Sequence, residues 1–259
     1  MSVLFEARNL DVAIGGHQVC RRLNWRVNAG EYWAILGKNG AGKSTLLATI
    51  AGLRSPQGGE LFIDGRPLGE LAARELAALR GYLPQRSQDP FAATVLETAL
   101  VGRHPHLGRW DWESRQDKVI AEAALAEVGL AGLEERDVLT LSGGERQRLG
   151  LAQLLTQAPH LFLLDEPLAH LDINHQVAQM ELLAKRAIQG ANPGAGVVAV
   201  LHDPGFAARY CRHALLLFGD GDWLAGPVAE IVTAENLSRL YGHPLRRLGG
   251  APYPVFIPE

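Results

Sequence analysis

The sequence predicts an α/β fold with a mostly parallel central sheet, a small antiparallel sheet at the N-terminal end and a helical insert. Short apolar runs alternate with helical stretches along the chain, a pattern typical of parallel strands joined by helices. About the first 30 residues and the segment 58–68 instead alternate apolar with polar residues between glycines, as antiparallel strands do. Residues from about 89 to 157 lack a convincing buried strand and carry an amphipathic pattern at 117–130, which predicts helices.

Three apolar runs are expected to be buried strands of the parallel sheet. Residues 32–36 read YWAIL and end at Gly37, and a helix is expected from about Lys43 to Gly52. Residues 161–164 read LFLL and residues 197–201 read VVAVL. Because these runs are apolar at every position, both faces of each strand must be covered, so none of them is an edge strand.

The predicted domain organisation is one large α/β domain over residues 1–235, with the helical insert at about 89–157, and a C-terminal tail over 236–259. A chain of 259 residues is long enough to bury such a core. The tail ends in APYPVFIPE, and its three prolines predict an extended strap rather than a helix.

Composition excludes several classes of protein. Hydrophobic residues make up 47% of the chain, which argues against global disorder. The 25 basic and 28 acidic residues give a net charge of −3 without a basic run, so no nucleic acid partner is expected. The apolar runs are of strand length, far short of the ~20 residues that cross a bilayer. Cys20 and Cys211 are too far apart in sequence for a metal clip and read as reduced thiols.

Residues 37–45 read GKNGAGKST, a glycine-rich loop between a predicted strand and a predicted helix. Glycines let the backbone wrap around phosphates with its N–H groups pointing inward, and the helix N-terminus adds positive potential. Lys43 is expected to reach the β- and γ-phosphates, and Ser44 to offer its hydroxyl to Mg²⁺. A simple glycine-rich turn is the alternative. The predicted phosphate-binding residues are Gly37, Asn39, Gly40, Gly42, Lys43, Ser44 and Thr45. This loop, called the cradle below, predicts a P-loop NTPase with a RecA-like core that uses ATP and Mg²⁺.

Two carboxylates follow the apolar run at 161–164. Asp165 is expected at the carboxyl end of a buried strand, where ligands of open α/β sheets bind, and is predicted to hold Mg²⁺ together with Ser44. Glu166 is the next residue and points elsewhere, so we predict that it polarises the attacking water as a general base. An apolar strand followed by two acidic residues is common on its own. It is the cradle elsewhere in the same chain that favours a catalytic interpretation of Asp165 and Glu166.

Residues 141–148 read LSGGERQR and resemble the signature of ATP-binding-cassette (ABC) ATPases. The resemblance covers motifs from about 35 to 205 and, in architecture, about the first 235 residues. It implies a head-to-tail homodimer in which the signature of one subunit closes on the ATP held by the other. The residues that it assigns to this contact in trans are Ser142, Gly143, Gly144 and Glu145. An ordinary serine cap followed by a glycine turn is the alternative.

The same resemblance assigns three further residues. Gln85, in YLPQR, matches the glutamine that senses Mg²⁺ and the attacking water and that links the core to the helical insert. His202, in VLHD, matches the histidine that contacts the γ-phosphate; a satisfied core histidine is the alternative. Asp172, in LAHLD, matches an aspartate of the dimer interface, and it is also well placed to cap a helix. Near Ile14 the family usually has an aromatic residue that stacks on adenine. Ile14 is not aromatic, so the residue that would stack on the base is missing from this sequence.

Several segments resemble importers of metal chelates, namely TVLETALVGRHPHLGRW, EPLAHLD and GPVAEIVTAENLSRLYG. The resemblance implies cobalamin, a ferric siderophore or haem as cargo, without naming which. It implies polytopic permease subunits as partners, a periplasmic-type substrate-binding protein as an indirect partner, and a peripheral location on the cytoplasmic face of the membrane. Trp110 and Trp112 either pack against the permease or cap the core of the insert. The alternatives are an importer of another small solute and a soluble ABC ATPase that does not drive transport.

Overall fold

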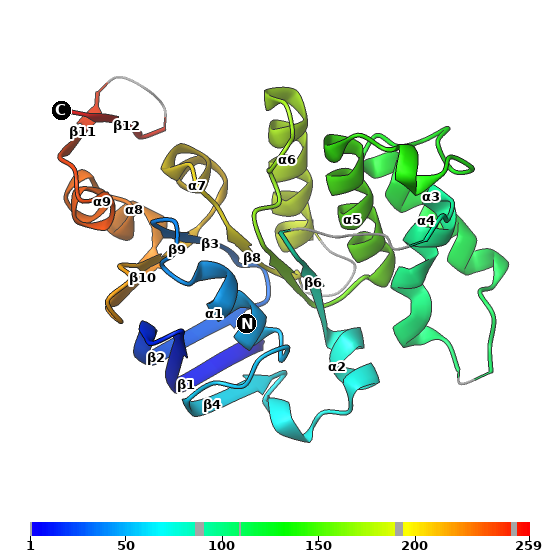
Figure 1. Cartoon of the computed structure of the whole chain (residues 1–259), viewed down its shortest axis with the longest axis horizontal. Coiled ribbons are helices and arrows are strands. Elements are labelled where there is room, and N and C mark those ends of the chain that lie inside the picture. The colour runs from blue at the N-terminus through cyan, green and yellow to red at the C-terminus, as the bar shows by residue number, and fades with distance from the viewer. Residues whose placement is uncertain (1, 86–90, 109, 190–193, 250–252) are drawn as a thin grey trace.

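A computed structural model of the chain describes residues 2–85, 91–108, 110–189, 194–249 and 253–259 (Figure 1). Its centre is a six-stranded sheet with the strand order β10-β9-β3-β8-β7-β6. Neighbouring strands from β6 to β9 are parallel, and β10 is antiparallel to β9. The strands are β3 (Tyr32–Gly37), β6 (Arg80–Leu83), β7 (Leu161–Leu164), β8 (Gly196–Val200), β9 (His213–Leu217) and β10 (Trp223–Pro227). The mostly parallel sheet that the apolar runs predict is therefore confirmed.

The sheet separates two hydrophobic cores. Tyr32, Ala34 and Leu36 of β3 face one core, while Trp33 and Ile35 face the other. The first core is covered by the insert and by α6 (Ile173–Gln189) and α7 (Pro204–Tyr210), and the second by α1 (Lys43–Ile50) and the N-terminal sheet. Every residue of β3, β7 and β8 is buried, as the continuous apolar runs require.

The N-terminal sheet is antiparallel, with the order β2-β1-β4-β5. Its strands are β1 (Val3–Ile14), β2 (His17–Asn28), β4 (Gly58–Ile63) and β5 (Arg66–Pro67). Burial alternates along much of β2, so one face of the sheet packs on the core and the other is exposed. Edge-to-face contacts from Trp25 to Phe5 and Trp33, with ring centroids 5.6 and 5.3 Å apart, join this sheet to β3.

The insert is helical, as predicted. It contains α3 (Val95–Leu100), η2 (Val101–His106), α4 (Arg115–Glu127), η3 (Val138–Thr140) and α5 (Gly143–Gln157). Each described α-helix of the insert begins with a capping box. The hydroxyl of the residue before the helix accepts from the third helical N–H, and the acidic side chain of that third residue accepts from the N–H of the hydroxyl residue. In Figure 1 these helices form one end of the molecule, and the C-terminal elements lie at the other end.

The C-terminal tail is extended at residues 255–258, as its prolines predict, and that stretch pairs with another strand. It holds most of α9 (Ala234–Tyr241) and a hairpin of β11 (Leu245–Leu248) with β12 (Val255–Pro258). Pro254 precedes β12 and Pro258 ends it, so neither proline interrupts the strand. The remaining elements are η1 (Leu68–Glu70), α2 (Ala73–Leu79) and α8 (Val228–Ile231). Among the described residues, the structure contains no helix long and apolar enough for a bilayer.

Candidate functional site

The cradle follows β3 and leads into α1. Gly40 and Gly42 have φ angles of 82° and 88°, in the left-handed region that favours glycine. A Cβ on Gly42 would lie 2.3 Å from Cγ2 of Val19, and one on Gly37 would lie 2.8 Å from the carbonyl oxygen of Leu217. Glycine is therefore required both by the backbone conformation and by the neighbours that close around the loop.

Lys43, the first residue of α1, lies beneath this loop with only 6% of its surface exposed. Its Nζ donates to the carbonyl oxygens of Gly37 and Lys38, at 2.8 and 2.9 Å. Burial lowers the pKa of Lys43, and the charges of Glu166 and Asp165 oppose that shift. The ammonium group is thus held against the loop, where a phosphate would attract it.

Ser44 and Asp165 meet next to Lys43. The Ser44 hydroxyl donates to Oδ1 of Asp165 at 3.0 Å, and the Asp165 backbone N–H donates to the carbonyl oxygen of Leu83 on the neighbouring strand β6. Asp165 is 2% exposed, and burial raises its pKa although the Ser44 hydrogen bond opposes the shift. A hydroxyl beside a carboxylate is the hard oxygen donor set that Mg²⁺ prefers, so these two residues fit that ion.

Glu166 is held by the two other residues that the sequence assigns to the same chemistry. Its Oε2 accepts from Nε2 of Gln85 at 2.8 Å, and its Oε1 lies 2.8 Å from Nε2 of His202. The three side chains follow β6, β7 and β8, which are neighbours in the sheet and end at the same edge. Glu166 has a φ of 51°, in the left-handed region that costs a residue with a Cβ conformational energy.

These residues line one pocket of about 510 Å³. Its lining residues are Ile14, Asn39, Gly40, Gly42, Lys43, Ser44, Thr45, Gln85, Glu166 and His202. Ile14 lies at this pocket with 42% of its surface exposed, where the family usually has an aromatic residue. A branched aliphatic side chain offers contact area to a base but no π face for stacking.

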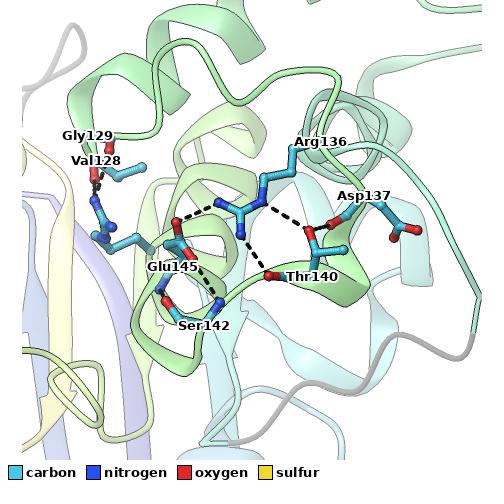
Figure 2. Close-up of polar contacts among 8 residues, drawn as sticks. Val128, Gly129, Arg136, Asp137, Thr140, Ser142 and Glu145 are labelled. Atoms are coloured by element: carbon cyan, nitrogen blue, oxygen red, sulfur yellow. Dashed lines mark hydrogen bonds and ion pairs between the residues drawn. The ribbon is translucent and has the colours of Figure 1, made fainter.

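The signature does not contribute to the lining of this pocket. Ser142 caps α5: its hydroxyl accepts from the backbone N–H of Glu145 at 3.3 Å, and the Glu145 carboxylate accepts from the Ser142 N–H at 2.8 Å (Figure 2). Gly143 and Gly144 lie against His170, and a Cβ on Gly144 would stand 3.0 Å from its carbonyl oxygen. Within one chain, therefore, the capping role of Ser142 is the one that the geometry satisfies.

Asp172 also caps a helix. Its Oδ1 accepts from the backbone N–H of His175 and lies next to Nδ1 of the same residue, both at 2.9 Å. The His175 hydrogen bonds lower the pKa of Asp172. The Asp172 side chain is exposed and lies outside the pocket lining. Of the two roles expected from sequence, helix cap and dimer-interface residue, the single chain shows the helix cap.

Sequence reasoning missed two residues that support the pocket. Gln147, inside the signature, is buried, and its Nε2 donates to the carbonyl oxygens of Glu166 and Pro167 at 3.3 and 3.2 Å. Tyr241, at the end of α9, donates its hydroxyl to the carbonyl oxygen of His202 at 3.5 Å. The polar Gln147 among the apolar positions of α5 was a usable signal, whereas nothing local marks Tyr241.

Trp110 and Trp112 do not cap the core of the insert, because they are 84% and 87% exposed. With His104 and Glu113 they line a shallow pocket of about 360 Å³. His106 contacts the carbonyl oxygen of Gln157 instead. Across the described parts of the chain, no three side chains of the metal-binding types gather into a cluster.

A loop of backbone N–H groups backed by a buried lysine is suited to a polyphosphate, and the adjoining hydroxyl and carboxylate are suited to the divalent ion that accompanies it. The fold places this loop between a central parallel strand and the following helix. These features define the class of P-loop nucleoside triphosphatases.

Within that class, the chain belongs to the ABC transporter family, whose family model matches residues 20–169. It is 42% identical to the hemin import ATP-binding protein HmuV of Deinococcus radiodurans, over 91% of this chain and 88% of that protein. It is 38% identical to the ferric enterobactin transport ATP-binding protein FepC of Escherichia coli K12, over 90% of this chain and 85% of that protein. ATP hydrolysis is therefore its reaction.

Solved structures agree with this assignment. An ABC transporter described as of the metal-chelate type, in an inward-facing conformation, superposes with a TM-score of 0.86 at 28% identity, over 99% of this chain and 98% of that chain. A dimeric ATP-binding cassette with ADP and Pi superposes with a TM-score of 0.74 at 26% identity, over 87% of this chain and 99% of that chain. The predicted fold class, including the antiparallel N-terminal sheet, is confirmed.

Proposed function

We propose that this chain is the ATP-hydrolysing subunit of an importer for a metal chelate, and that it works as a homodimer attached to polytopic permease subunits at the cytoplasmic face of the membrane. The observation that carries the catalytic part is the convergence of Gln85, Glu166 and His202 on one side of the cradle, each at the end of a neighbouring strand. A periplasmic-type substrate-binding protein would deliver the cargo from the other side.

Each side chain of the pocket has a role in the proposed reaction. Lys43 and the cradle N–H groups bind the β- and γ-phosphates and stabilise the charge that develops during transfer. Ser44, Asp165 and Gln85 would hold Mg²⁺, which would neutralise part of the phosphate charge. Glu166 accepts a proton from the attacking water, and His202 donates a hydrogen bond toward the γ-phosphate. Gln85 and His202 hold the two Glu166 oxygens beside the cradle, and each of these oxygens has a second lone pair that can accept from the water.

Replacing Glu166 with Gln tests this assignment. The amide keeps the size of the side chain but cannot take up a proton, so hydrolysis should slow by roughly 10²–10⁴-fold. Binding of ATP should persist, because Lys43 and the cradle are unchanged. Single-turnover hydrolysis and equilibrium binding of ATP measure the two quantities separately. A variant that hydrolyses at nearly the wild-type rate would remove Glu166 from the reaction.

The homodimer completes the site in this proposal. Ser142, Gly143, Gly144 and Glu145 lie outside the pocket of their own chain, which supports their action on the ATP of a second subunit. Asp172 lies on the exposed start of α6 and would face the partner subunit. Closure of the pair would bring the two inserts together and move the permease subunits, with ATP binding favouring the closed state.

Hemin and a ferric siderophore are the proposed cargoes, because the similar proteins HmuV and FepC are named for them. Cobalamin is a third metal chelate that the same assay can test. Transporter reconstituted with its binding protein should hydrolyse ATP faster when the right chelate is added. No stimulation by any of the three chelates, with stimulation by another solute, would overturn the cargo assignment and leave the ATPase intact.

The permease is tested by recovery of the tagged chain from detergent-solubilised native membranes, with partners identified by mass spectrometry. We expect a multi-helix membrane protein. Ribosomes or nucleic acid without a permease would favour a soluble ABC ATPase instead.

Trp110 and Trp112, both exposed, are proposed to belong to the permease-facing surface. Their double replacement by Ala should reduce the recovered permease several-fold and leave ATP hydrolysis by the isolated chain unchanged; full recovery would place the contact elsewhere.

A further inference from the structure

Residues 134–141, called the linking segment below, follow α4 in the chain, lead into the first turn of α5 and hydrogen-bond to the start of α3. Its backbone is hydrogen-bonded to the start of α3 at three points. The Leu96 N–H donates to the Glu134 carbonyl at 2.9 Å, and the Val95 N–H to the Arg136 carbonyl at 3.0 Å. The Val138 N–H returns a bond to the carbonyl of Ala93 at 2.9 Å. The linking segment therefore follows any displacement of the N-terminus of α3.

The side chain of Arg136 fastens the other end of the linking segment (Figure 2). Its Nη1 donates to Oε1 of Glu145 at 3.1 Å, its Nε to Oγ1 of Thr140 at 3.0 Å, and its Nη2 to the Thr140 carbonyl at 2.8 Å. One planar guanidinium thus holds both the residue before the signature and a residue within it. A fork of donors in fixed geometry restrains direction as well as distance.

The two oxygens of Glu145 have separate tasks. Oε2 accepts from the Ser142 N–H and closes the capping box, while Oε1 faces Arg136. Removing Arg136 would leave the capping box of α5 complete, so the helix would still begin at the same residue. What would be lost is the side-chain restraint that Glu145 and Thr140 place on the position of this helix start relative to α3.

The other side of the same helix is held by Arg148. Its Nη1 donates to the carbonyl oxygens of Val128 and Gly129 at the end of α4, at 3.1 and 2.9 Å. Arg148 ties the body of α5 to α4, whereas Arg136 alone among these arginines contacts the first turn that carries the signature. Arg146 of the same helix also donates from Nη2 to the Val138 carbonyl of the linking segment, at 2.7 Å. Two arginines therefore connect α5 to that segment, and Arg136 is the one that reaches Glu145 in the first turn.

We propose that Arg136 is a positioning residue for the half of the ATP site that acts in trans: it fixes Ser142 and Gly144 relative to α3, so that the signature meets the nucleotide of the second subunit in register. This proposal rests on the proposed function, in which the signature closes on the partner's ATP. Small misplacements of a group that contacts a reacting phosphate have large effects, because the contact must form in one geometry. The helix α3 begins ten positions after Gln85. Because Arg136 connects the linking segment to Glu145, a displacement of α3 would also displace the signature.

The test measures ATP-dependent dimerisation in a Glu166→Gln background, where ATP is bound but hydrolysed slowly. Sedimentation of the full chain with Mg·ATP gives the dimer dissociation constant. Addition of Arg136→Ala should weaken dimerisation about tenfold. Arg136→Lys keeps a cation for Glu145 but not the fork for Thr140, so we expect an intermediate loss of about threefold. The ATP affinity of the monomer, measured at concentrations below dimerisation, and the melting temperature should stay at their background values.

Arg186→Ala is the matched control. Arg186 of α6 forms an ion pair with Glu127 of α4, with Nη2 2.6 Å from Oε1, and its partial exposure resembles that of the Arg136 pair. Dimerisation of this variant should equal that of the background. A general loss of surface ion pairs would affect both variants alike and would contradict the assignment of Arg136.

Two results would overturn the proposal. Either Arg136→Ala dimerises as tightly as the background, or its loss of dimerisation comes with an equal loss of monomer ATP affinity, which indicates a structural defect. If Arg136→Ala does not fold, the same two criteria apply to Arg136→Lys. If instead the Glu166→Gln chain itself fails to dimerise with ATP, the homodimer of the proposed function is wrong, a separate outcome that these measurements distinguish.

Discussion

The two helix starts of the proposed ATP site are built in opposite ways. The first turn of α1 follows Gly42, which offers no capping side chain, and it holds no acidic residue, so its N–H groups are left for a ligand. The first turn of α5 is capped by Ser142 and carries Glu145, whose carboxylate satisfies one donor and offsets the positive end of the helix. The cradle is thus ready for a phosphate on its own, whereas the first turn of the signature helix is satisfied within its own chain; in the proposed function, the second subunit brings it to a phosphate.

The largest effect expected from this difference comes from Ser142→Arg compared with Lys43→Ala. A bulky cation at Ser142 should block closure of the signature on ATP and reduce hydrolysis by about 10²–10³-fold. ATP affinity of the isolated chain should be unchanged, since Ser142 lies outside its pocket. Lys43→Ala should lose ATP affinity itself. Binding of a fluorescent ATP analogue separates the two variants; equal losses of affinity would break the comparison.

A smaller effect is expected from Gly42→Ala, with Gly132→Ala as control. Both glycines have φ angles in the left-handed region, at 88° and 84°. A Cβ on Gly42 would also clash with Val19, whereas one on Gly132 would meet open space. Gly132→Ala should cost about 1–2 kcal/mol of folding free energy from strain alone. Gly42→Ala should cost more and should also weaken ATP binding. Denaturant unfolding and ATP titration test the pair, and similar unfolding costs would show that Val19 yields to the new methyl group.

The smallest effect concerns the charge of Asp165. Burial raises the pKa of Asp165, so the ionised carboxylate costs folding free energy above that raised pKa, and the cost disappears as pH falls through it. Asp165→Asn keeps an acceptor for Ser44 and should raise the melting temperature at pH 7.5 on the order of 2 °C. The difference from wild type should shrink as the pH falls through the raised pKa of Asp165, while hydrolysis is lost at every pH. A difference that grew on acidification would reverse the assigned sign.

What could be predicted from sequence depended on how local the signal was. The cradle is local, because glycines, lysine and serine occupy consecutive positions between a strand and a helix. The meeting of Glu166 with Gln85 and His202 was also within reach, since all three follow buried strands whose ends share one edge. The catalytic roles given to these three residues remain predictions, and Glu166→Gln tests the first of them.

Other features lay beyond the sequence because they depend on contacts between distant segments. The carbonyl oxygens that Gln147 binds lie nearly twenty positions further on, after a strand whose packing no local pattern specifies. Tyr241 reaches His202 because α9 brings it back to a residue 39 positions earlier in the chain. Proline content predicted the extended backbone of residues 255–258 but not its pairing with β11.

The separation of the cradle from the signature within one chain has a genetic consequence. A Lys43→Ala chain keeps a sound signature, and a Ser142→Arg chain keeps a sound cradle. In a mixed head-to-tail pair, one ATP site would combine both defects and the other would contain neither. Two alleles that are each inactive alone should therefore complement one another when expressed together, and two alleles damaged in the same element should not.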